Sequence, residues 1–361
     1  MNKRRQLLTY GLATVCGPAL SSFAFGADPV GVAIVYIGPP GDAGWSYSHE
    51  LAVKELERRL GTSVKVTRVE NVPESAEAER VYRQLAARGN RIIIGTAFGY
   101  MNAIHKVARD YPKVTFLHCL GYVVTPSIAT YIANLYEGAY LCGAIGAAVT
   151  KTKTLGFIGA VPIPDVFRTM NAFAIGARKV DPSIVVKVVW VNAWHDPGKE
   201  RQAAVALIDG GADVLLQDTN STATISVAQE RGVHAFGWNS DMSAFGPQAC
   251  LASIIPDWSR YYEQQTRAVL SGEWKSQAYV GTLANGMVDV RGFNTKTLSP
   301  KTMERFKVDR QAIIDGKLDV FAGPLKDTTG KVRAEAGGSL DAMAREKMDW
   351  TVEGIVGAAT K

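Results

Sequence analysis

Histidine and cysteine are scarce in this sequence, and neither occurs at the spacing of a metal site or a redox pair. The 361 residues include five His and four Cys. No His-x-x-x-His pattern and no Cys-x-x-Cys pair occurs, so the sequence predicts no zinc site. A Gly-x-Ser-x-Gly turn and a Walker motif are absent too. We therefore expect no catalytic residue, no metal and no cofactor, although acids such as Asp218 and Asp241 leave hydrolysis open as an alternative.

A strong excess of charge of one sign is also missing. The formal net charge is +6, and Lys3, Arg4 and Arg5 belong to an N-terminal segment that we expect to be removed. The mature chain then carries about +3, which is too mild to favour a nucleic-acid partner. Charged residues make up 20% and hydrophobic residues 47% of the chain, and this composition with this length is typical of a globular protein of two domains.

Residues 1–26 have the pattern of an export signal: a basic start, an apolar stretch from Leu7 and small residues at Ala24 and Gly26. A membrane anchor is disfavoured, because glycine, proline and serine interrupt a stretch barely long enough to span a bilayer. The paired arginines leave the twin-arginine route open beside ordinary secretion. The bulky Val15 argues against lipoprotein processing at Cys16. We expect a free periplasmic protein.

Three cysteines remain after such processing, Cys119, Cys142 and Cys250, each in an apolar run. An odd number cannot pair completely in an oxidising compartment. We expect buried free thiols, with one disulfide as the alternative.

Short apolar runs alternate with amphipathic stretches from residue 31 onward. Strands are expected at 31–38, 63–70, 91–98, 114–121 and 128–135, with helices at 48–60, 75–89 and 100–111. The pattern then restarts, with strands at 154–161, 185–192, 213–219 and 233–239 and helices at 166–180, 198–211 and 223–232. Such alternation predicts an α/β protein with two doubly wound, Rossmann-like lobes, each a parallel sheet covered by helices.

The expected lobe boundaries follow from where the two patterns meet. We assign residues 28–134 and about 257–285 to the first lobe, and 135–256 and about 286–361 to the second, so that several chain crossings form a hinge. The run "QAYVGTLANGMVDV" is typical of an edge hairpin or strand. The last sixty residues are typical of terminal helices and a loop.

The loop "GPPGDAGWSYSHE" follows the first expected strand and poses a choice between a phosphate cradle and a stacking site. A dinucleotide loop needs backbone N–H donors where this chain has Pro39 and Pro40, and Asp42 would repel phosphate. We therefore expect Trp45 to offer a flat face to a ligand, with Asp42 and Ser46 hydrogen bonding to it or merely capping the helix.

Polar and aromatic residues recur at the other expected strand ends, which is where doubly wound sheets bind ligands. Glu137 differs, because it is a lone carboxylate on a small, apolar helix and needs water, a cation or a ligand donor. Core packing, capping and salt bridges are the alternatives for these residues. The full set of expected ligand-binding residues is Asp42, Trp45, Tyr47, Phe98, Tyr100, Glu137, Phe167, Asn171, Trp194, Asp218, Trp238 and Asp241. Stacking rings with amides and carboxylates suit a flat, neutral ligand.

The order of these motifs resembles the basic membrane protein (BMP) family of ABC-transporter solute-binding proteins, which includes purine nucleoside receptors. The matching pieces are "GPPGDAGWSYSHE", "GTAFGYM", "LYEGAYLCG", "VPIPDVFRTMNAFAIGA", "VNAWHDPGKE", "FGWNSDM" and "MDWTVEGIVG". The resemblance implies a type I periplasmic binding protein that closes over its ligand. It further implies that Trp45 stacks on a base, that Asp241 occupies the place of a ribose-binding acid, and that Glu137 lies near the ligand.

This chain departs from the nucleoside receptors in its first loop and in its extra tryptophans, Trp194 and Trp238. Their bulk would fill the space of a ribose, which favours a free base such as adenine. The expectation is a monomeric receptor that delivers a purine base or nucleoside to an ABC permease in the inner membrane, driven by a separate ATPase. A sensing module for a membrane partner, a nucleoside hydrolase and a sugar receptor remain alternatives.

Overall fold

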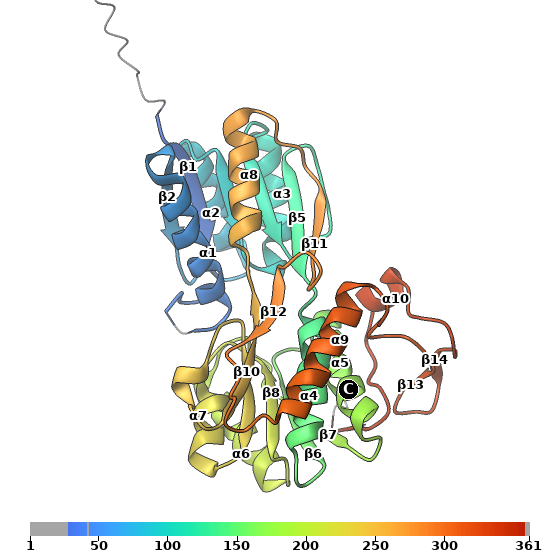
Figure 1. Ribbon diagram of the computed structural model, residues 1–361. Coiled ribbons are helices and arrows are strands. Elements are labelled where there is room, and N and C mark those ends of the chain that lie inside the picture. The colour runs from blue at the N-terminus through green and yellow to red at the C-terminus, as the bar shows by residue number, and fades with distance from the viewer. Residues whose placement is uncertain (1–27, 42, 358–361) are drawn as a thin grey trace, which may run out of the picture.

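The computed structural model describes residues 28–41 and 43–357, and the expected export signal lies outside them. Two separate sheets, each flanked by helices, form two lobes joined by several passages of the chain (Figure 1). This arrangement confirms the expected α/β class with two doubly wound lobes. No helix in the described ranges is long and apolar enough to cross a membrane.

The first sheet defines lobe 1 and has the strand order β11-β5-β4-β3-β1-β2, with all neighbours parallel. Its strands are β1 (Val30–Val35), β2 (Val64–Val69), β3 (Ile92–Gly95), β4 (Thr115–Cys119), β5 (Ile128–Ala133) and β11 (Ala278–Gly281). The helices of this lobe are α1 (Trp45–Leu60), α2 (Ala76–Ala87), α3 (Met101–Asp110) and α8 (Ser259–Ser271).

The second sheet defines lobe 2 and has the order β12-β10-β9-β8-β6-β7-β15, in which only the β10–β12 pair is antiparallel. Its strands are β6 (Thr154–Gly159), β7 (Val185–Trp190), β8 (Val214–Asp218), β9 (His234–Trp238), β10 (Cys250–Pro256), β12 (Val288–Arg291) and β15 (Ile355–Val356). Its helices are α4 (Leu135–Val149), α5 (Pro164–Val180), α6 (Pro197–Asp209), α7 (Ala223–Arg231) and α9 (Pro300–Ile314).

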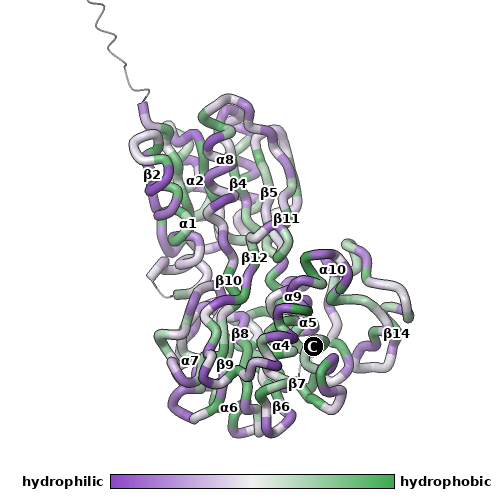
Figure 2. The backbone as a smooth tube through the Cα atoms, viewed as in Figure 1, coloured by the Kyte–Doolittle hydropathy of each residue, from purple (hydrophilic) through white to green (hydrophobic). Residues whose placement is uncertain are grey.

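Local sequence explains where several helices begin. The side chain of Ser75 accepts a hydrogen bond from the Glu77 backbone N–H ahead of α2, and Asp196 accepts one from the Lys199 N–H ahead of α6. These caps satisfy backbone donors that the first turn of a helix leaves open. Figure 2 shows the helices alternating between hydrophilic and hydrophobic residues, as expected of elements that cover a sheet on one side.

Helices α4 and α5 pack unusually closely within lobe 2, and glycine makes this possible. A Cβ atom added to Gly143 would lie 2.0 Å from the Phe173 carbonyl oxygen, and one added to Gly176 would lie 2.0 Å from that of Tyr140. The backbones of the two helices therefore contact each other at these glycines, where no side chain keeps them apart. The three described cysteines, Cys119, Cys142 and Cys250, are buried and free, which confirms the expected thiols.

Two expectations for the C-terminal half are wrong in part. The run 277–290, expected as an edge hairpin or strand, holds the two edge strands β11 and β12 and is not a hairpin, because they join different sheets and the chain passes between the lobes at 282–287. The last segment is mostly not helical: after α9 come the short strands β13 (Leu325–Lys326) and β14 (Val332–Ala334), the five-residue α10 (Ala342–Glu346), and β15 on the edge of the lobe 2 sheet. Hydrogen bonds from Asn171 on α5 hold this segment, which amphipathic spacing does not reveal.

Candidate functional site

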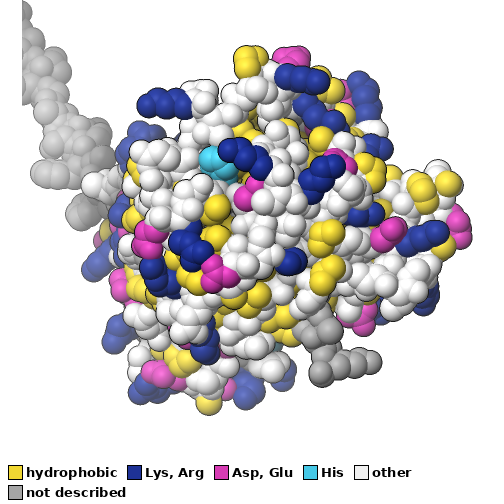
Figure 3. Space-filling model, turned by 90° about the horizontal axis from the view of Figure 1, so that it is seen from below, with side chains coloured by type: hydrophobic (Ala, Val, Ile, Leu, Met, Phe, Trp, Pro, Cys, Tyr) yellow, Lys and Arg dark blue, Asp and Glu magenta, His cyan; other side chains and the backbone are white. Residues whose placement is uncertain are grey.

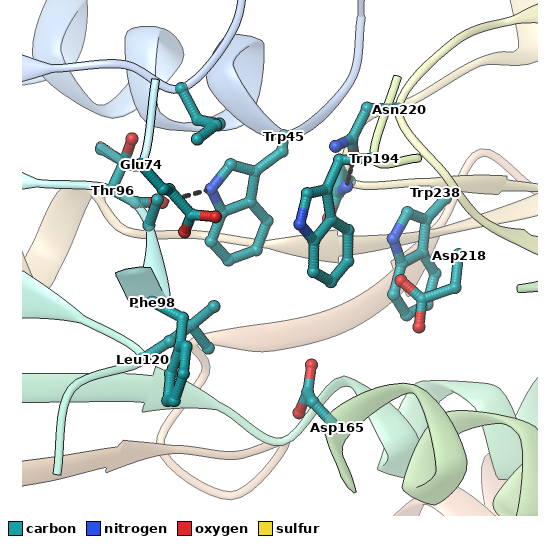
Figure 4. A pocket seen from close by; sticks show the side chains of 13 residues that line it. Trp45, Glu74, Thr96, Phe98, Leu120, Asp165, Trp194, Asp218, Asn220 and Trp238 are labelled. Atoms are coloured by element: carbon teal, nitrogen blue, oxygen red, sulfur yellow. Dashed lines mark hydrogen bonds between the residues drawn. The ribbon is translucent and has the colours of Figure 1, made fainter. Parts of the chain in front are cut away.

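A cavity lies between the lobes, where the carboxyl ends of both sets of parallel strands face each other. This is the place at which doubly wound sheets bind ligands. Lobe 1 contributes Ile37, Trp45, Glu74, Thr96, Ala97, Phe98 and Leu120, and lobe 2 contributes Asp165, Trp194, Asp218, Asn220, Trp238 and Asn239. Figure 4 shows the indole rings of Trp45, Trp194 and Trp238 side by side across the cavity, with Phe98 and Asp165 below them.

The indole of Trp45 is fixed in place from two sides. Its Nε1–H donates a hydrogen bond of 2.6 Å to the Thr96 carbonyl oxygen, the dashed line of Figure 4. Behind it, the rings of His49 and Trp258 make edge-on contacts at centroid distances of 4.8 Å and 5.5 Å. A ring held in this way presents its remaining face to the cavity without first losing conformational freedom.

The support behind Trp45 is itself a buried aromatic group. His49 stacks on Trp258 at 4.7 Å, and its Nδ1 forms a hydrogen bond of 2.6 Å with the Tyr262 hydroxyl. Tyr262 in turn is hydrogen bonded to the Tyr131 hydroxyl at 2.8 Å. Burial lowers the pKa of His49 well below its ordinary value of 6.5, so this imidazole stays neutral at physiological pH.

On the lobe 2 side, a chain of hydrogen bonds orders the cavity wall. The Asn220 backbone N–H donates to the Trp194 carbonyl oxygen at 3.0 Å, and the Asn239 amide nitrogen donates to the Asn220 side-chain oxygen at 3.0 Å. Asn239 follows β9 directly and has a φ of 71°, while Leu120, which follows β4 in lobe 1, has a φ of 62°. Asparagine tolerates this left-handed conformation, whereas leucine rarely adopts it, so the backbone of Leu120 is the unusual one.

Three carboxyl groups line the cavity, and they differ in their partners. Asp165 accepts a hydrogen bond of 2.6 Å from the guanidinium of Arg168, and Glu74 accepts one of 2.6 Å from the Gly99 N–H. Asp218 is only 5% exposed, and its Oδ2 has no hydrogen-bond partner among the described residues. Burial, with a smaller contribution from Asp165, raises the pKa of Asp218 well above its ordinary value of 3.8.

The lobes also touch directly beside the cavity. The hydroxyl of Ser240 in lobe 2 donates a hydrogen bond to the Ala43 carbonyl oxygen in lobe 1. A Cβ atom added to Gly44 would lie 2.2 Å from the carbonyl oxygen of Asn220 in lobe 2. The loop before α1 therefore packs against the wall after β8, and the structure is in a closed arrangement.

Residues 30–320 match the family described as "ABC transporter substrate-binding protein PnrA-like". The chain belongs to this family. Its members bind substrates for transporters and are not enzymes, and they are the group that the motifs of the sequence resemble.

Two relatives align with nearly all of this substrate-binding protein. A purine-binding protein of Brucella abortus (strain 2308) is 42% identical over 345 residues, which cover 95% of this chain and 98% of that protein. A putative ABC transporter glucose-binding protein of Haloferax volcanii is 36% identical over 332 residues, 91% of this chain and 81% of that one.

Solved structures show the same fold at lower identity. A solute-binding protein of Aeropyrum pernix K1 superposes with a TM-score of 0.71 at 17% identity, covering 84% of this chain and 95% of that one. A solute-binding protein of Conexibacter woesei gives a TM-score of 0.68 at 20% identity, covering 80% and 98%.

Five of the expected ligand-binding residues of this substrate-binding protein line the cavity: Trp45, Phe98, Trp194, Asp218 and Trp238. Asp42 lies outside the described residues.

The structure does not place the other six at the cavity. Tyr100 is buried in lobe 1 and donates to the Val72 carbonyl oxygen at 2.6 Å, while Tyr47 is half-buried beside the apolar residues around Ala43. Phe167 is buried with its ring 5.6 Å from that of Trp190. These rings take part in packing.

The three polar residues among those six have structural partners. Glu137 accepts a hydrogen bond of 2.7 Å from the Leu283 N–H in the hinge, and burial raises its pKa. Asn171 binds the backbone of the C-terminal segment, donating to the Trp350 carbonyl oxygen at 2.9 Å. Asp241 is exposed and accepts from the Ser243 N–H at 2.9 Å. Each carboxylate or amide thus meets the need for a partner without a ligand.

The set of expected ligand-binding residues omitted Glu74, Thr96, Leu120, Asp165 and several further cavity residues. The rule that selected the strand ends could have found Thr96 and Leu120, because each directly follows a strand, β3 or β4. Asp165 stands in the first turn of α5. Glu74 lies five residues beyond β2 and carried no comparable signal.

Proposed function

We propose that this protein captures a purine, as the free base or its nucleoside, between its two lobes and delivers it to an ABC permease in the inner membrane. The observation that carries the proposal is the row of three indole rings along one narrow cavity between the lobes. Stacking of a base on an aromatic ring is worth about 1–3 kcal/mol by analogy with nucleic-acid binders, and a purine is flat enough to lie against such rings.

The strong similarity to a purine-binding protein over nearly the whole chain supports the same ligand class. None of the residues that line the cavity, all of them described, is Lys, Arg or His, so a phosphorylated ligand would find no cation there. A free base fits the proposal better than a nucleoside, because Trp194 and Trp238 occupy the lobe 2 side of the cavity.

The proposal further holds that the protein is exported to the periplasm and works as a monomer. A separate ATPase would drive the permease. On the face seen in Figure 3, basic and acidic side chains are interspersed, which does not favour nucleic acid. A sensing role with a membrane partner would use the same cavity, and identification of the protein that the closed form binds would separate the two roles.

A sugar is the second candidate, because the relative from Haloferax volcanii is named as a putative glucose-binding protein. A thermal-shift panel of purines, pyrimidines, nucleosides and sugars separates the candidates. We expect adenine or another purine to raise the melting temperature and glucose to leave it unchanged. The opposite pattern would make the protein a sugar receptor, and turnover of a nucleoside in the same samples would make it a hydrolase.

Replacement of Trp45 by alanine tests the stacking contact. We expect purine affinity to fall about 5- to 150-fold, the equivalent of 1–3 kcal/mol. Trp274→Ala is the matched control, because the Trp274 Nε1–H also donates to a partner, Gln265 at 2.8 Å, but the ring lies outside the cavity. Unchanged purine affinity in Trp45→Ala would remove Trp45 from the binding contact.

A further inference from the structure

Two buried oxygen atoms that lack hydrogen-bond donors lie on adjacent strand ends of the cavity wall. Asp218 ends β8 and Asn239 follows β9, its neighbour in the sheet. The Asp218 Oδ2 and the Asn239 Oδ1 have no hydrogen-bond partner among the described residues, and the side chains are only 5% and 1% exposed. Buried acceptors without donors are costly, so both atoms point to a ligand that supplies the donors.

The orientation of the Asn239 amide follows from its neighbour. Its nitrogen donates to the Asn220 side-chain oxygen at 3.0 Å, which turns its oxygen away from that bond and leaves it as an acceptor. The other two acids of the cavity already accept hydrogen bonds, Asp165 from Arg168 and Glu74 from Gly99. Among the side chains that line the cavity, Asp218 and Asn239 are therefore the ones with a buried oxygen that has no donor among the described residues.

We propose that Asp218, assisted by Asn239, is the specificity-determining residue of the cavity and selects ligands that carry an amino group. An exocyclic amino group brings two N–H donors on one nitrogen, one for each oxygen. An oxo group at the same ring position brings only lone pairs and is repelled. The inference rests on the proposed function and names the chemistry within it: aminopurines such as adenine over oxopurines such as hypoxanthine.

The charge around Asp218 agrees with this selection. Asp165 faces the same cavity, Glu74 lines it from lobe 1, and the guanidinium of Arg168 is bonded to Asp165. Burial beside a second carboxyl group raises the pKa of Asp218, and a carboxyl group that is neutral still accepts an N–H donor through its carbonyl oxygen. The O–H of a neutral Asp218 would donate to an oxo group, so the selection belongs to the carboxylate form, which the N–H donors of a bound amino group favour.

The test compares adenine with 6-methylpurine, in which a methyl group of similar size replaces the amino group. Calorimetric titration of the unaltered protein is expected to give an affinity for adenine at least about tenfold higher than for 6-methylpurine, and also higher than for hypoxanthine. In Asp218→Leu, which keeps the branching of the side chain and removes both oxygens, the gap between adenine and 6-methylpurine should shrink to about threefold or less.

Asp241→Asn is the control, because Asp241 follows the neighbouring strand β9 but lies outside the cavity, and the gap should remain at least about tenfold. Asp218→Ala, which also leaves no acceptor on the side chain, serves as a second variant should the leucine protein not fold. Equal affinities for adenine and 6-methylpurine in the unaltered protein would overturn the inference and leave the purine function standing. A full gap in both Asp218 variants would also overturn it. Binding of hypoxanthine without binding of adenine would overturn the inference alone, and failure of every purine and nucleoside to bind the unaltered protein would refute the proposed function as well.

Discussion

Gly44 offers a way to disturb closure of the lobes without disturbing either lobe. It immediately precedes α1 of lobe 1, and an added Cβ atom would lie 2.2 Å from the Asn220 carbonyl oxygen and 2.9 Å from the Asn220 Cα, both in lobe 2. These are backbone atoms, so the contact cannot be relieved by rotating a side chain. The substitution Gly44→Ala should therefore force the lobes apart at this point.

The expected size of the effect follows from the cost of overpacking, typically about 1–3 kcal/mol. This cost falls on the closed form alone, so the dissociation constant for the ligand should rise roughly 5- to 150-fold. The open, ligand-free protein avoids the clash, and its melting temperature should stay within about 1 °C of the unaltered protein.

Gly143→Ala is the matched control, because its added Cβ atom would lie 2.0 Å from a backbone oxygen within one lobe, that of Phe173. The same overpacking cost then falls on folding, and the melting temperature should drop by about 2–10 °C. Calorimetry and thermal unfolding measure both quantities. Ligand affinity that is unchanged in Gly44→Ala, or a loss of stability equal to that of Gly143→Ala, would refute the closed arrangement as the ligand-bound form.

Three further predictions concern stability and its dependence on pH. The folded protein keeps the Asp218 proton to higher pH than the unfolded chain, so the free energy of unfolding falls as pH rises above about 3.8. Asp218→Leu should therefore raise the melting temperature at pH 7, and raise it by less near pH 4, while purine binding weakens. A melting temperature at pH 7 equal to that of the unaltered protein would contradict this. The pKa of His49 is lowered on folding, so the free energy of unfolding should fall as pH drops below about 6.5. His49→Gln should lose less of its stability between pH 7 and 5 than the unaltered protein does. Equal losses of stability would count against a buried neutral imidazole. Asn171→Ala removes the hydrogen bonds to Trp350 and Val352, each 2.9 Å long; limited proteolysis should then cut residues 321–357 faster, and an unchanged cutting rate would show that other contacts hold the segment.

Much of the fold could be predicted because strand and helix periods alternate so regularly along the first 240 residues. The runs that begin at Ile92 and Val214 are short and open with three consecutive apolar residues, and such runs mark buried parallel strands. The C-terminal part could not be predicted in the same way. Strand β15 has two residues and owes its place to pairing with Val186, and α10 has five residues. Segments this short are set by tertiary contacts that leave no periodic signal.

The cavity shows a similar division between residues. Trp45, Trp194 and Trp238 stand beside strand ends, and the rule for ligand sites in doubly wound sheets brings them together. Phe167 and Tyr100 also follow strands but turn into the core, because sequence position does not fix the direction of a side chain on an irregular loop or first helical turn. The buried carboxylate of Glu137 accepts a hydrogen bond from the Leu283 N–H, which is distant in the sequence and so could not be identified as its partner beforehand.

The most direct measurement of the central claim is a crystal structure of the mature protein grown with adenine. The account predicts the base between the lobes, stacked on the indole of Trp45, with its amino group toward Asp218 and with the contact between Gly44 and Asn220 preserved. Adenine bound outside the cavity would contradict the account. So would a cavity that stays empty in the crystals grown with adenine but holds glucose in crystals soaked with glucose.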